Sequence, residues 1–435
     1  MTRRKHQCGK KSKKSRKMKN WLINIRRAGV PLVLLDTFDA AQSILSVAQT
    51  VINREDKKGI PEGDKVSFLE YDVVRGLNGD RVSPKQTLLS IKGQMLAREI
   101  SPNGAVDSGN PFEALTLLAK FSPQNSVIFI HSSHDILAQG PLCQAVWNLR
   151  DSFKANRSTL VLMTPGCKVP ELLKYDLVKI VEPLPSAEEI GKIFDSICSQ
   201  VGLTESLERK QAAIERTRGI LTGFAVEQAL ALSISKSGLD LQELSAQRRA
   251  FISQTDGLEI RTDTSTFADV AGYDAIKKRI SQEINCKNPP DVILWLDEVR
   301  EMLAAANGLD GTTRDQLGHW QCWLQDKLNS NQFTGIILAG FPGTCKSLIS
   351  ASTRNEAKCE CLRVDFGAQK SKFVGESEQK ARQVTRTVDA IGSRILCLAT
   401  CNGLEGIPAP FLSRFTGGTY FFDLATEQER DAIWL

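Results

Sequence analysis

Long apolar runs are missing from this sequence of 435 residues. No stretch approaches the ~18 consecutive apolar residues that a membrane-spanning helix requires, and no apolar core of a signal peptide is visible. We therefore expect no membrane partner and a cytoplasmic location. The eleven cysteines are scattered and odd in number, which favours reduced thiols over a disulfide framework.

Patterns that bind zinc are also scarce. The pair Cys359-x-Cys361 has no second pair of ligands, and the sequence contains only four histidines. His131 and His134 are predicted to belong to a loop that follows a strand. We do not expect a structural zinc site, because such a site needs four nitrogen or sulfur ligands.

Acidic residues are absent from the first 20 positions, which contain ten lysines or arginines. Removing these ten charges from the formal net charge of +6 leaves about −4 for residues 21–435. We expect residues 1–20 to form a basic, disordered tail, because like charges repel one another. Such a tail can bind nucleic acid by releasing counterions. The alternatives are a targeting sequence, an upstream extension or a solubilising tail.

The most informative motif is a glycine-rich stretch that ends in lysine and serine. It consists of Gly340, Phe341, Pro342, Gly343, Thr344, Cys345, Lys346 and Ser347. In a phosphate-binding (Walker A-like) loop, backbone N–H groups cradle phosphate oxygens, the lysine adds a cation, and the serine hydroxyl ligates magnesium. An apolar run at 335–339 predicts a strand before it, and residues from 348 onward predict a helix whose N-terminus favours anions. The pattern predicts a site for ATP and Mg²⁺; the alternative is a glycine-rich turn with a chance lysine.

Two other predicted strands end in polar residues suited to the same chemistry. The apolar run Val292–Leu296 is followed by Asp297 and Glu298, and the run 395–401 is followed by Asn402. We predict that Asp297 holds the metal and that Glu298 polarises the water that attacks the γ-phosphate. Asn402 would orient that water or sense the γ-phosphate. Without a phosphate loop nearby, these residues would indicate only a strand end and a turn.

Taken together, residues 262–435 resemble an ATPase module of the AAA family. Three further stretches carry the resemblance: residues 267–273 (FADVAGY), 371–378 (SKFVGESE) and 404–415 (LEGIPAPFLSRF). Within the family, the chain is similar to the AAA protein encoded by a hypothetical chloroplast reading frame. The resemblance implies a P-loop NTPase-like parallel sheet with flanking helices.

The resemblance also implies contacts with other molecules. One stretch packs near the adenine and another grips a substrate in the pore of a ring. The residues so implied are Val270, Ala271 and Gly272 for the adenine, and Phe373, Val374 and Gly375 for the pore loop. The third stretch carries Arg414, which in AAA rings completes the site of a neighbouring subunit. The implied protein is a homo-oligomer that remodels a protein or nucleic-acid partner.

Three departures from the pattern of the family limit which of its properties can be expected of this chain. Cys345 stands where the motif has glycine, so a side chain could crowd the nucleotide, and a positive φ would add strain. The strand before Asp297 lies upstream of the phosphate loop, whereas the family usually places it downstream. Parallel strands joined by helical crossovers tolerate such a transposition if each crossover is right-handed. The helical lid of the family is not found after a predicted strand at 419–424, close to Leu435.

Residues 21–255 are expected to form a second unit. Apolar runs predict strands at 31–35, 66–69, 127–130, 159–163 and 178–181, and helical stretches separate them at 40–53, 111–120 and 144–153. This alternation predicts a parallel sheet covered on both faces. The order resembles an AAA core without a phosphate loop, with residues 36–39 at the place of the loop and residues 132–135 at the place of the acidic pair. The alternative is an unrelated α/β domain.

The expected fold class is thus α/β, with a degenerate AAA-like domain at 21–185 and an AAA core with rearranged strand order at 262–435. Between them, residues 186–255 are predicted to form a helical, lid-like bundle in which Thr222 caps a helix. Two functions remain open. The chain is either an ATPase that couples ATP hydrolysis to remodelling, or a hydrolysis-deficient nucleotide-binding scaffold or switch.

Overall fold

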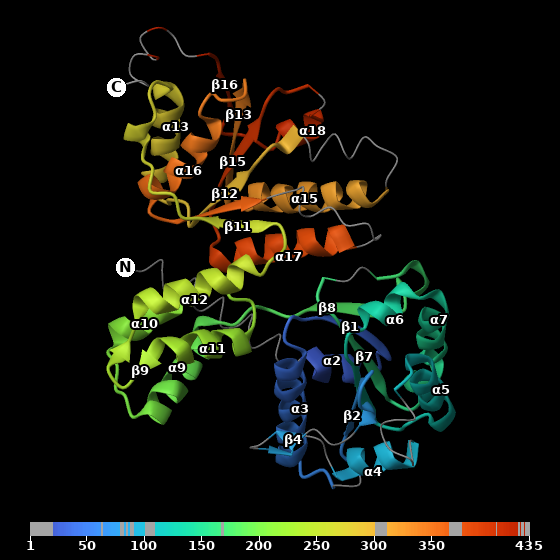
Figure 1. Cartoon of the computed structure of the whole chain (residues 1–435). Coiled ribbons are helices and arrows are strands. Elements are labelled where there is room, and N and C mark those ends of the chain that lie inside the picture. Colours follow the sequence, from blue (N-terminus) through green and yellow to red (C-terminus); the bar gives the residue numbers. More distant parts are fainter. Residues whose placement is uncertain are drawn as a thin grey trace. The chain divides into compact units, whose positions relative to one another are not determined.

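The computed structural model describes residues 21–61, 64–78, 82–83, 86–87, 91–100, 109–166, 169–300, 311–364, 376–405 and 407–424, together with residues 427 and 430. The chain forms two compact units, Met1–Ser186 and Ala187–Leu435 (Figure 1). The expected basic tail at 1–20 and the expected pore-loop residues Phe373, Val374 and Gly375 lie outside the described residues.

The N-terminal unit is built on a six-stranded sheet with the order β3-β2-β6-β7-β1-β8. Strand β3 pairs antiparallel with β2, and every other pair in this sheet is parallel. The strands are β1 (Leu32–Asp36), β2 (Ser67–Asp72), β3 (Gly76–Asn78), β6 (Ser126–Ile130), β7 (Thr159–Met163) and β8 (Leu177–Val181); β4 (Val82–Ser83) and β5 (Gln86–Thr87) pair separately.

Helices cover both faces of this sheet, because alternate strand residues point to opposite sides. Phe68, Val127 and Phe129 pack with α2 (Trp21–Arg27) and α3 (Ala40–Lys57). The opposite side chains of the same strands pack with a second group of helices. These are α4 (Ile91–Ile100), α5 (Pro111–Phe121), α6 (His134–Ala138), α7 (Gly140–Asn148) and α8 (Arg150–Ala155).

The C-terminal unit contains a second six-stranded sheet with the order β11-β14-β12-β15-β13-β16. Strand β11 pairs antiparallel with β14, and the remaining pairs are parallel. The strands are β11 (Leu258–Arg261), β12 (Val292–Leu296), β13 (Phe333–Gly340), β14 (Glu360–Val364), β15 (Ile395–Cys401) and β16 (Thr419–Phe422).

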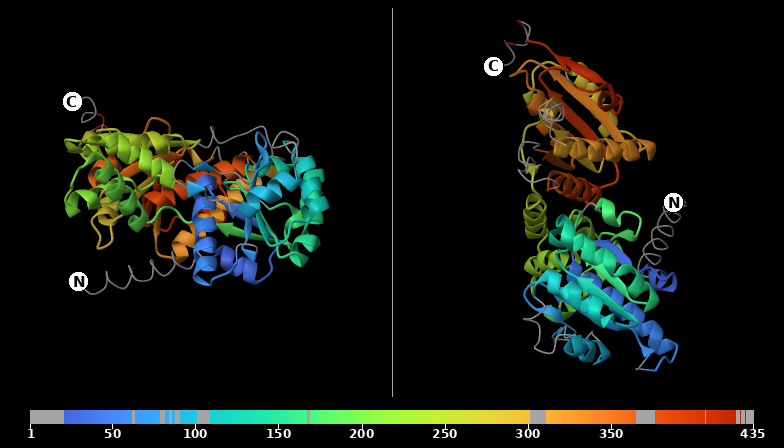
Figure 2. Two further views of the ribbon diagram at one scale, coloured as in Figure 1. Left: turned by 90° about the horizontal axis from the view of Figure 1, so that it is seen from below. Right: turned by 90° about the vertical axis from the view of Figure 1, so that its right-hand side faces the viewer.

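Helices again lie on both sides of this sheet (Figures 1 and 2). Leu294 and the other residues on its face pack with α15 (Gly311–Asn329) and α17 (Glu376–Ile391). Ile293 and its neighbours on the other face pack with α13 (Asp274–Ile284) and α16 (Lys346–Ala357). A short helix, α18 (Ala409–Leu412), lies between β15 and β16.

The two sheets match position by position. In each, an antiparallel edge strand is followed by five parallel strands. The third position is held by β6 in the first sheet and by β12 in the second, and the fifth by β1 and β13. In the N-terminal unit the fifth-position strand comes first in the chain, whereas in the C-terminal unit β12 precedes β13. Strand β12, which is transposed in the chain, therefore fills the same sheet position as β6, which is not transposed.

A helical bundle precedes the second sheet. It comprises α9 (Ala187–Val201), α10 (Leu207–Arg216), α11 (Gly223–Ser233) and α12 (Leu241–Ser253), with a small hairpin of β9 (Ile234–Ser235) and β10 (Gly238–Leu239). The Thr222 hydroxyl accepts a hydrogen bond from the Ala225 amide at 3.1 Å, so the predicted N-cap is confirmed. The bundle belongs to the same compact unit as the second sheet. The sequence pattern predicts this bundle as a segment of its own between the two α/β domains.

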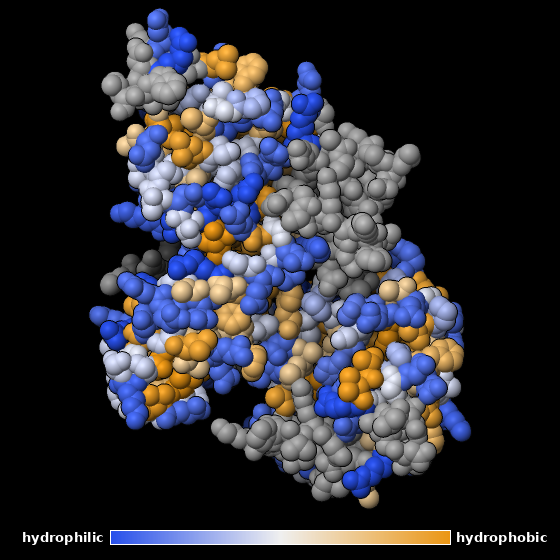
Figure 3. Space-filling view, viewed as in Figure 1, coloured by the Kyte–Doolittle hydropathy of each residue, from blue (hydrophilic) through white to orange (hydrophobic). Residues whose placement is uncertain are grey.

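The surface is mixed in character. On the face shown in Figure 3, hydrophilic side chains are interspersed with smaller apolar groups. Among the helices of the described residues, none is long and apolar enough to span a bilayer.

Candidate functional site

The glycine-rich loop begins where β13 ends, and two of its glycines are required by geometry. Gly340 has φ of 152°, and a Cβ there would lie 2.1 Å from the carbonyl oxygen of Phe422. Gly343 has φ of 80° and faces open space. These conformations let the chain turn sharply from the strand into α16.

Cys345 occupies the position directly before the lysine, where this motif has glycine. Its backbone is left-handed, with φ of 62° and ψ of 13°, and it is the N-cap of α16. The strain expected from the sequence is therefore present, at about 1–2 kcal/mol for a residue that carries a Cβ. The side chain packs against the apolar cluster that contains Ile349 and Leu338. Replacing the glycine of the motif by Cys345 therefore adds strain to the backbone of the loop.

The Lys346 ammonium is held inside the loop. It donates to the carbonyl oxygens of Gly340 and Phe341 at 2.8 and 2.5 Å, and contacts the Thr344 hydroxyl at 3.3 Å. Burial lowers the pKa of Lys346, and the nearby Cys401, Asp297 and Glu298 oppose this shift. The two carboxylates therefore lie close enough to act electrostatically on the lysine.

Unused donors surround this lysine. The backbone amides of residues 343–347 donate no hydrogen bond to any other described residue. Four such amides are left over at the start of every α-helix, where the dipole also favours negative charge. Ser347 is exposed at the same helix start. The loop therefore fits a phosphate group, which needs several convergent N–H donors and a cation.

Asp297 lies at the carboxyl end of β12 and is held from both sides. Its Oδ1 accepts a hydrogen bond from the Thr400 hydroxyl at 2.6 Å. Its Oδ2 accepts two bonds from the Arg363 guanidinium, at 2.7 and 3.0 Å. Glu298 follows with a φ of 50°, and its amide donates to Thr400 at 3.2 Å. One threonine thus orients the backbone and side chain of the acidic pair.

Arg363 lies in the neighbouring strand β14 and forms ion pairs with two carboxylates, Asp297 and Glu259. It also pairs with Glu259 at 3.1 Å, and its guanidinium lies 5.4 Å from the centre of the Trp295 ring. Oxygen ligands such as Asp297 and Ser347 suit Mg²⁺. In the structure, however, Arg363 neutralises Asp297, so a magnesium-bound water must compete with this ion pair.

Asn402 lies next to the loop because of strand register. It follows Cys401, whose partner in β13 is Ala339, one residue before Gly340. Asn402 is exposed, and its side chain forms no hydrogen bond with another residue that the structure describes. The third, fourth and fifth sheet positions therefore present Asp297 with Glu298, then Asn402, then the phosphate loop along one edge.

Comparisons with known proteins agree with this arrangement. A model described as "ATPase family associated with various cellular activities (AAA)" matches residues 336–398, and one described as "SpoVK-like AAA ATPase, N-terminal domain" matches residues 18–182. Two separate parts of the chain, residues 18–182 and 336–398, thus match models of AAA proteins. The AAA match runs from within β13 into β15, so β12 and the acidic pair lie upstream of it.

Relatives named "Uncharacterized AAA domain-containing protein ycf46" are similar to the chain. The protein of Gracilaria tenuistipitata var. liui is 23% identical over 299 residues, which cover 66% of this chain and 52% of the relative. The Guillardia theta protein is 23% identical over 296 residues, with 66% and 51% covered. The Trieres chinensis protein is 22% identical over 297 residues, with 66% and 52% covered. The chain spans about half the length of these AAA relatives.

The AAA lead-in stretch packs beside the helix of the phosphate loop. Val270 is buried in the cluster that contains Ile349 of α16, and its carbonyl accepts a hydrogen bond from the Lys277 ammonium. Ala271 and Gly272 follow it, and Gly272 has φ of 75°. No nucleotide contact of this stretch is tested, so its adenine role stays a prediction.

Arg414, the candidate trans-acting arginine of the AAA core, is engaged within its own chain. Its guanidinium donates to the carbonyl oxygens of Gln321, at 3.2 Å, and Pro410. Within the described ranges it forms no ion pair with a carboxylate. A guanidinium held only by neutral carbonyls keeps its full charge for another partner.

The AAA-like N-terminal unit has a carboxylate where the C-terminal unit has its loop. Asp36 ends β1 and is buried, accepting from the Gly166 amide at 2.7 Å and pairing with Lys179 at 3.2 Å. The Thr37 and Ser43 hydroxyls next to it both donate to Glu182. The buried Asp36 and the partly buried Glu182 are carboxylates, which repel phosphate, so this edge does not fit a nucleotide in the manner of the second sheet.

Sequence reasoning missed two residues of the site, Arg363 and Thr400. A signal for Thr400 exists, because it lies in a strand two residues before Asn402 and is thus near the same edge. The sequence indicates Arg363 less clearly, as a cation within the short run Glu360–Val364. Among the described residues no group of three histidine, cysteine or acidic residues is placed to hold a metal without further ligands.

Proposed function

We propose that the C-terminal core binds ATP with Mg²⁺ and hydrolyses it. The observation that carries the proposal is the edge shared by three adjacent strands, β12, β15 and β13, which end in the acidic pair, Asn402 and the phosphate loop. Ligands of open parallel sheets bind at the carboxyl ends of the strands. Which residues meet at this edge depends on the positions of the strands in the sheet and not on their order in the chain.

In this proposal each residue has one role. The free amides of residues 343–347 bind the phosphates, and Lys346 turns from the loop carbonyls to the outer phosphates. Ser347 and Asp297 hold Mg²⁺, which supplies charge neutralisation of the phosphates when bound. Glu298 polarises the attacking water, and Asn402 orients that water.

We propose further that the protein works as a homo-oligomer in which Arg414 reaches the site of a neighbouring copy. The arginine is available for this role because its partners in its own chain are neutral carbonyls. A trans-acting arginine stabilises the charge of the transition state and is worth orders of magnitude in rate. The work done by hydrolysis would be remodelling of a protein or nucleic-acid partner, with residues 1–20 as a contact for nucleic acid.

A second function, a nucleotide-binding scaffold or switch without useful hydrolysis, is favoured by three observations. Cys345 is strained, Lys346 is satisfied by its own loop, and Asp297 is neutralised by Arg363. Each of these adds a cost to forming the catalytic arrangement. None prevents binding of the phosphates by the free amides.

Turnover of ATP by the purified chain separates the two functions. The wild type and the Glu298→Gln variant are compared at several protein concentrations, with nucleotide binding measured in parallel by calorimetry. Mg²⁺-dependent turnover in the wild type, lost in the variant with binding retained, supports the ATPase. Binding of ATP without turnover above that of Glu298→Gln supports the scaffold. Absence of ATP binding in both would refute the proposal as a whole.

A further inference from the structure

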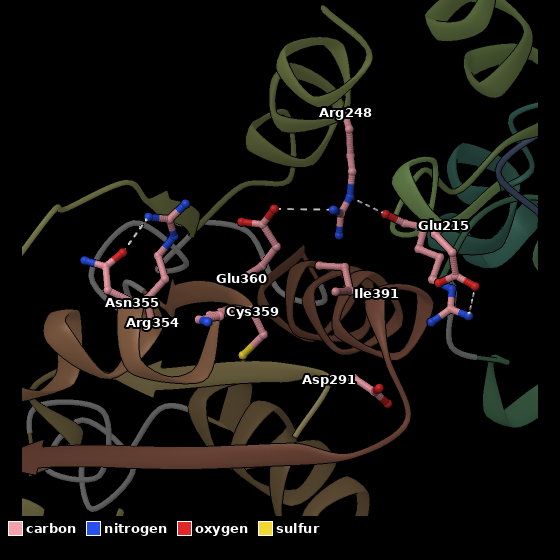
Figure 4. A pocket seen from close by; sticks show the side chains of 10 residues that line it. Glu215, Arg248, Asp291, Arg354, Asn355, Cys359, Glu360 and Ile391 are labelled. Atoms are coloured by element: carbon pink, nitrogen blue, oxygen red, sulfur yellow. Dashed lines mark hydrogen bonds and ion pairs between the residues drawn. The ribbon is translucent and has the colours of Figure 1, made fainter. Parts of the chain in front are cut away.

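A cavity of about 430 Å³ lies within the C-terminal unit, between the helical bundle and the second sheet (Figure 4). Glu215, Arg218 and Arg248 line it from the bundle. Asp291, Arg354, Lys358 and Glu360 are among the residues that line it from the sheet and its helices. Its volume is in the range of small-molecule sites, which are about 300–1,000 Å³.

The cavity is separate from the nucleotide site. Glu360 is the first residue of β14, and Asp291 immediately precedes β12. The cavity therefore lies at the amino ends of these parallel strands, whereas the phosphate loop follows the carboxyl end of β13. Helix α16 links the two edges, with Lys346 at its first turn and Lys358 at its C-cap.

All three acidic residues of the cavity are already engaged. Glu360 pairs with Arg248 at 3.3 Å, and Glu215 pairs with Arg218 at 2.7 Å. The carboxylate of Asp291 accepts hydrogen bonds from the amides of residues 393 and 394, at 2.8 and 3.0 Å. These interactions leave no carboxylate for the two remaining cations of the wall.

Those two cations are Arg354 and Lys358. Among the described residues, Arg354 donates to neutral oxygens alone, the carbonyl of Asp263 and the side chain of Asn355, both at 3.4 Å. Lys358 is exposed and has no hydrogen bond or ion pair with any residue in the described ranges. Among the described residues, neither cation forms an ion pair with a carboxylate, although the hydrogen-bonded Arg261 and the charge of Arg354 lower the pKa of the Asp263 carboxyl.

Two further features describe this wall. Lys358 adopts a left-handed conformation, with φ of 51°, at a helix end where glycine or asparagine is preferred. Burial lowers the pKa of Arg248; Glu360 opposes this shift, and the neighbouring Arg218 adds to it. The wall carries four cations against three carboxylates, and one of the cations, Lys358, has a left-handed backbone.

We propose that this cavity binds a small phosphorylated metabolite, with its phosphate between Arg354 and Lys358. A phosphate monoester carries nearly two negative charges, which matches two unpaired cations, and arginine binds phosphate through paired N–H donors. A triphosphate would bring more charge than the wall balances. Arg248 contacts Oε1 of Glu360, whereas its Oε2 atom is buried and accepts no hydrogen bond from the described residues, so a hydroxyl group on the ligand completes the fit.

The test uses ribose 5-phosphate as the probe and the full chain as the protein. Calorimetry is run with and without saturating MgADP, which occupies the phosphate loop if that site binds nucleotide. Saturable 1:1 binding that MgADP does not displace is expected. Displacement by MgADP would overturn the proposal, because the probe would then report the nucleotide site. Absence of saturable binding would also overturn it.

Substitutions at Lys358 and at a control lysine test whether ribose 5-phosphate binds in this cavity. Lys358→Gln should weaken affinity for ribose 5-phosphate about tenfold, because one charge-assisted hydrogen bond is lost, and Lys358→Arg should restore most of it. Lys236→Gln removes another exposed lysine, from the turn between β9 and β10, and should have no effect. Equal losses in Lys358→Gln and Lys236→Gln would show non-specific attraction and refute the site. Affinity for inorganic phosphate equal to that for ribose 5-phosphate would refute the hydroxyl contact with Glu360.

Discussion

A substitution of Arg363 tests whether its ion pair with Asp297 competes with the binding of Mg²⁺. In the structure its guanidinium donates two hydrogen bonds to the Oδ2 atom of Asp297, at 2.7 and 3.0 Å. The side chains of Arg363 and Asp297 are 31% and 15% exposed, so the pair is partly screened by solvent. If Mg²⁺ binding requires this pair to loosen, the pair stabilises only the metal-free state. The substitution Arg363→Gln should then favour the metal-bound state.

The magnitude follows from the geometry. Hydrogen bonds to charged groups contribute about 1.5–3 kcal/mol when buried, and exposed ion pairs contribute about 0–1 kcal/mol. A two-bond pair of intermediate exposure is therefore worth about 1–2 kcal/mol. Arg363→Gln should lower the free energy of unfolding of the metal-free protein by this amount. It should raise the affinity for Mg²⁺ in the nucleotide complex by about 5–30-fold.

The assay is a titration of Mg²⁺ into the complex with a fluorescent ATP analogue, at constant ionic strength. Arg261→Gln provides the matched control. Arg261 lies over the same Trp295 ring, at 5.7 Å, and pairs with Glu259 and Asp263, but it does not contact Asp297. The control should leave the affinity for Mg²⁺ unchanged. Weaker Mg²⁺ binding in Arg363→Gln would refute the reasoning, because it would mean that the arginine positions Asp297 for the metal.

Four further outcomes are expected. Lys346→Ala should lose ATP binding in calorimetry, because the outer phosphates lose their cation. Cys345→Gly should tighten ATP binding by removing a left-handed strain of about 1–2 kcal/mol, and unchanged affinity would count against this explanation. Arg414→Ala should abolish turnover while retaining ATP affinity, and wild-type turnover per chain should rise with protein concentration; constant turnover on dilution to monomer would exclude a trans role. Deleting residues 1–20 should weaken nucleic-acid binding and flatten its salt dependence, whereas no binding by the full chain at low salt would leave the tail without this role.

Much of the sheet architecture could be predicted from the sequence. The strands at 159–163 and 292–296 were predicted with their observed ends, and β6 to within one residue, because strands buried on both faces appear as short continuous apolar runs. The turn between β13 and α16 was predicted because glycine positions at fixed spacing reflect a local backbone requirement. The positive φ of Cys345 confirms that the requirement survives the substitution.

Elements without such local signals were missed or misplaced. One helix was predicted at 144–153, but α7 begins at Gly140 with a proline in its first turn, and α8 begins separately at Arg150. Proline is favoured at that position, so Pro141 was an available signal. Strands β11 and β14 were not predicted, because half-buried polar residues interrupt their apolar character. The Arg363–Asp297 pair joins residues 66 positions apart, and no local pattern encodes such a contact.

The transposed strand bears on which function is favoured. A strand contributes to this site through its place in the sheet, since the carboxyl ends of parallel neighbours meet at one edge wherever they occur in the chain. The N-terminal unit shows the same six positions filled in another chain order, so the position of β12 is not a defect. What separates an ATPase from a scaffold is therefore local: the strain at Cys345 and the ion pair at Asp297. Both are small energies, of about 1–2 kcal/mol each, and binding of a nucleotide with its metal can exceed them. The transposition alone gives no reason to expect loss of hydrolysis.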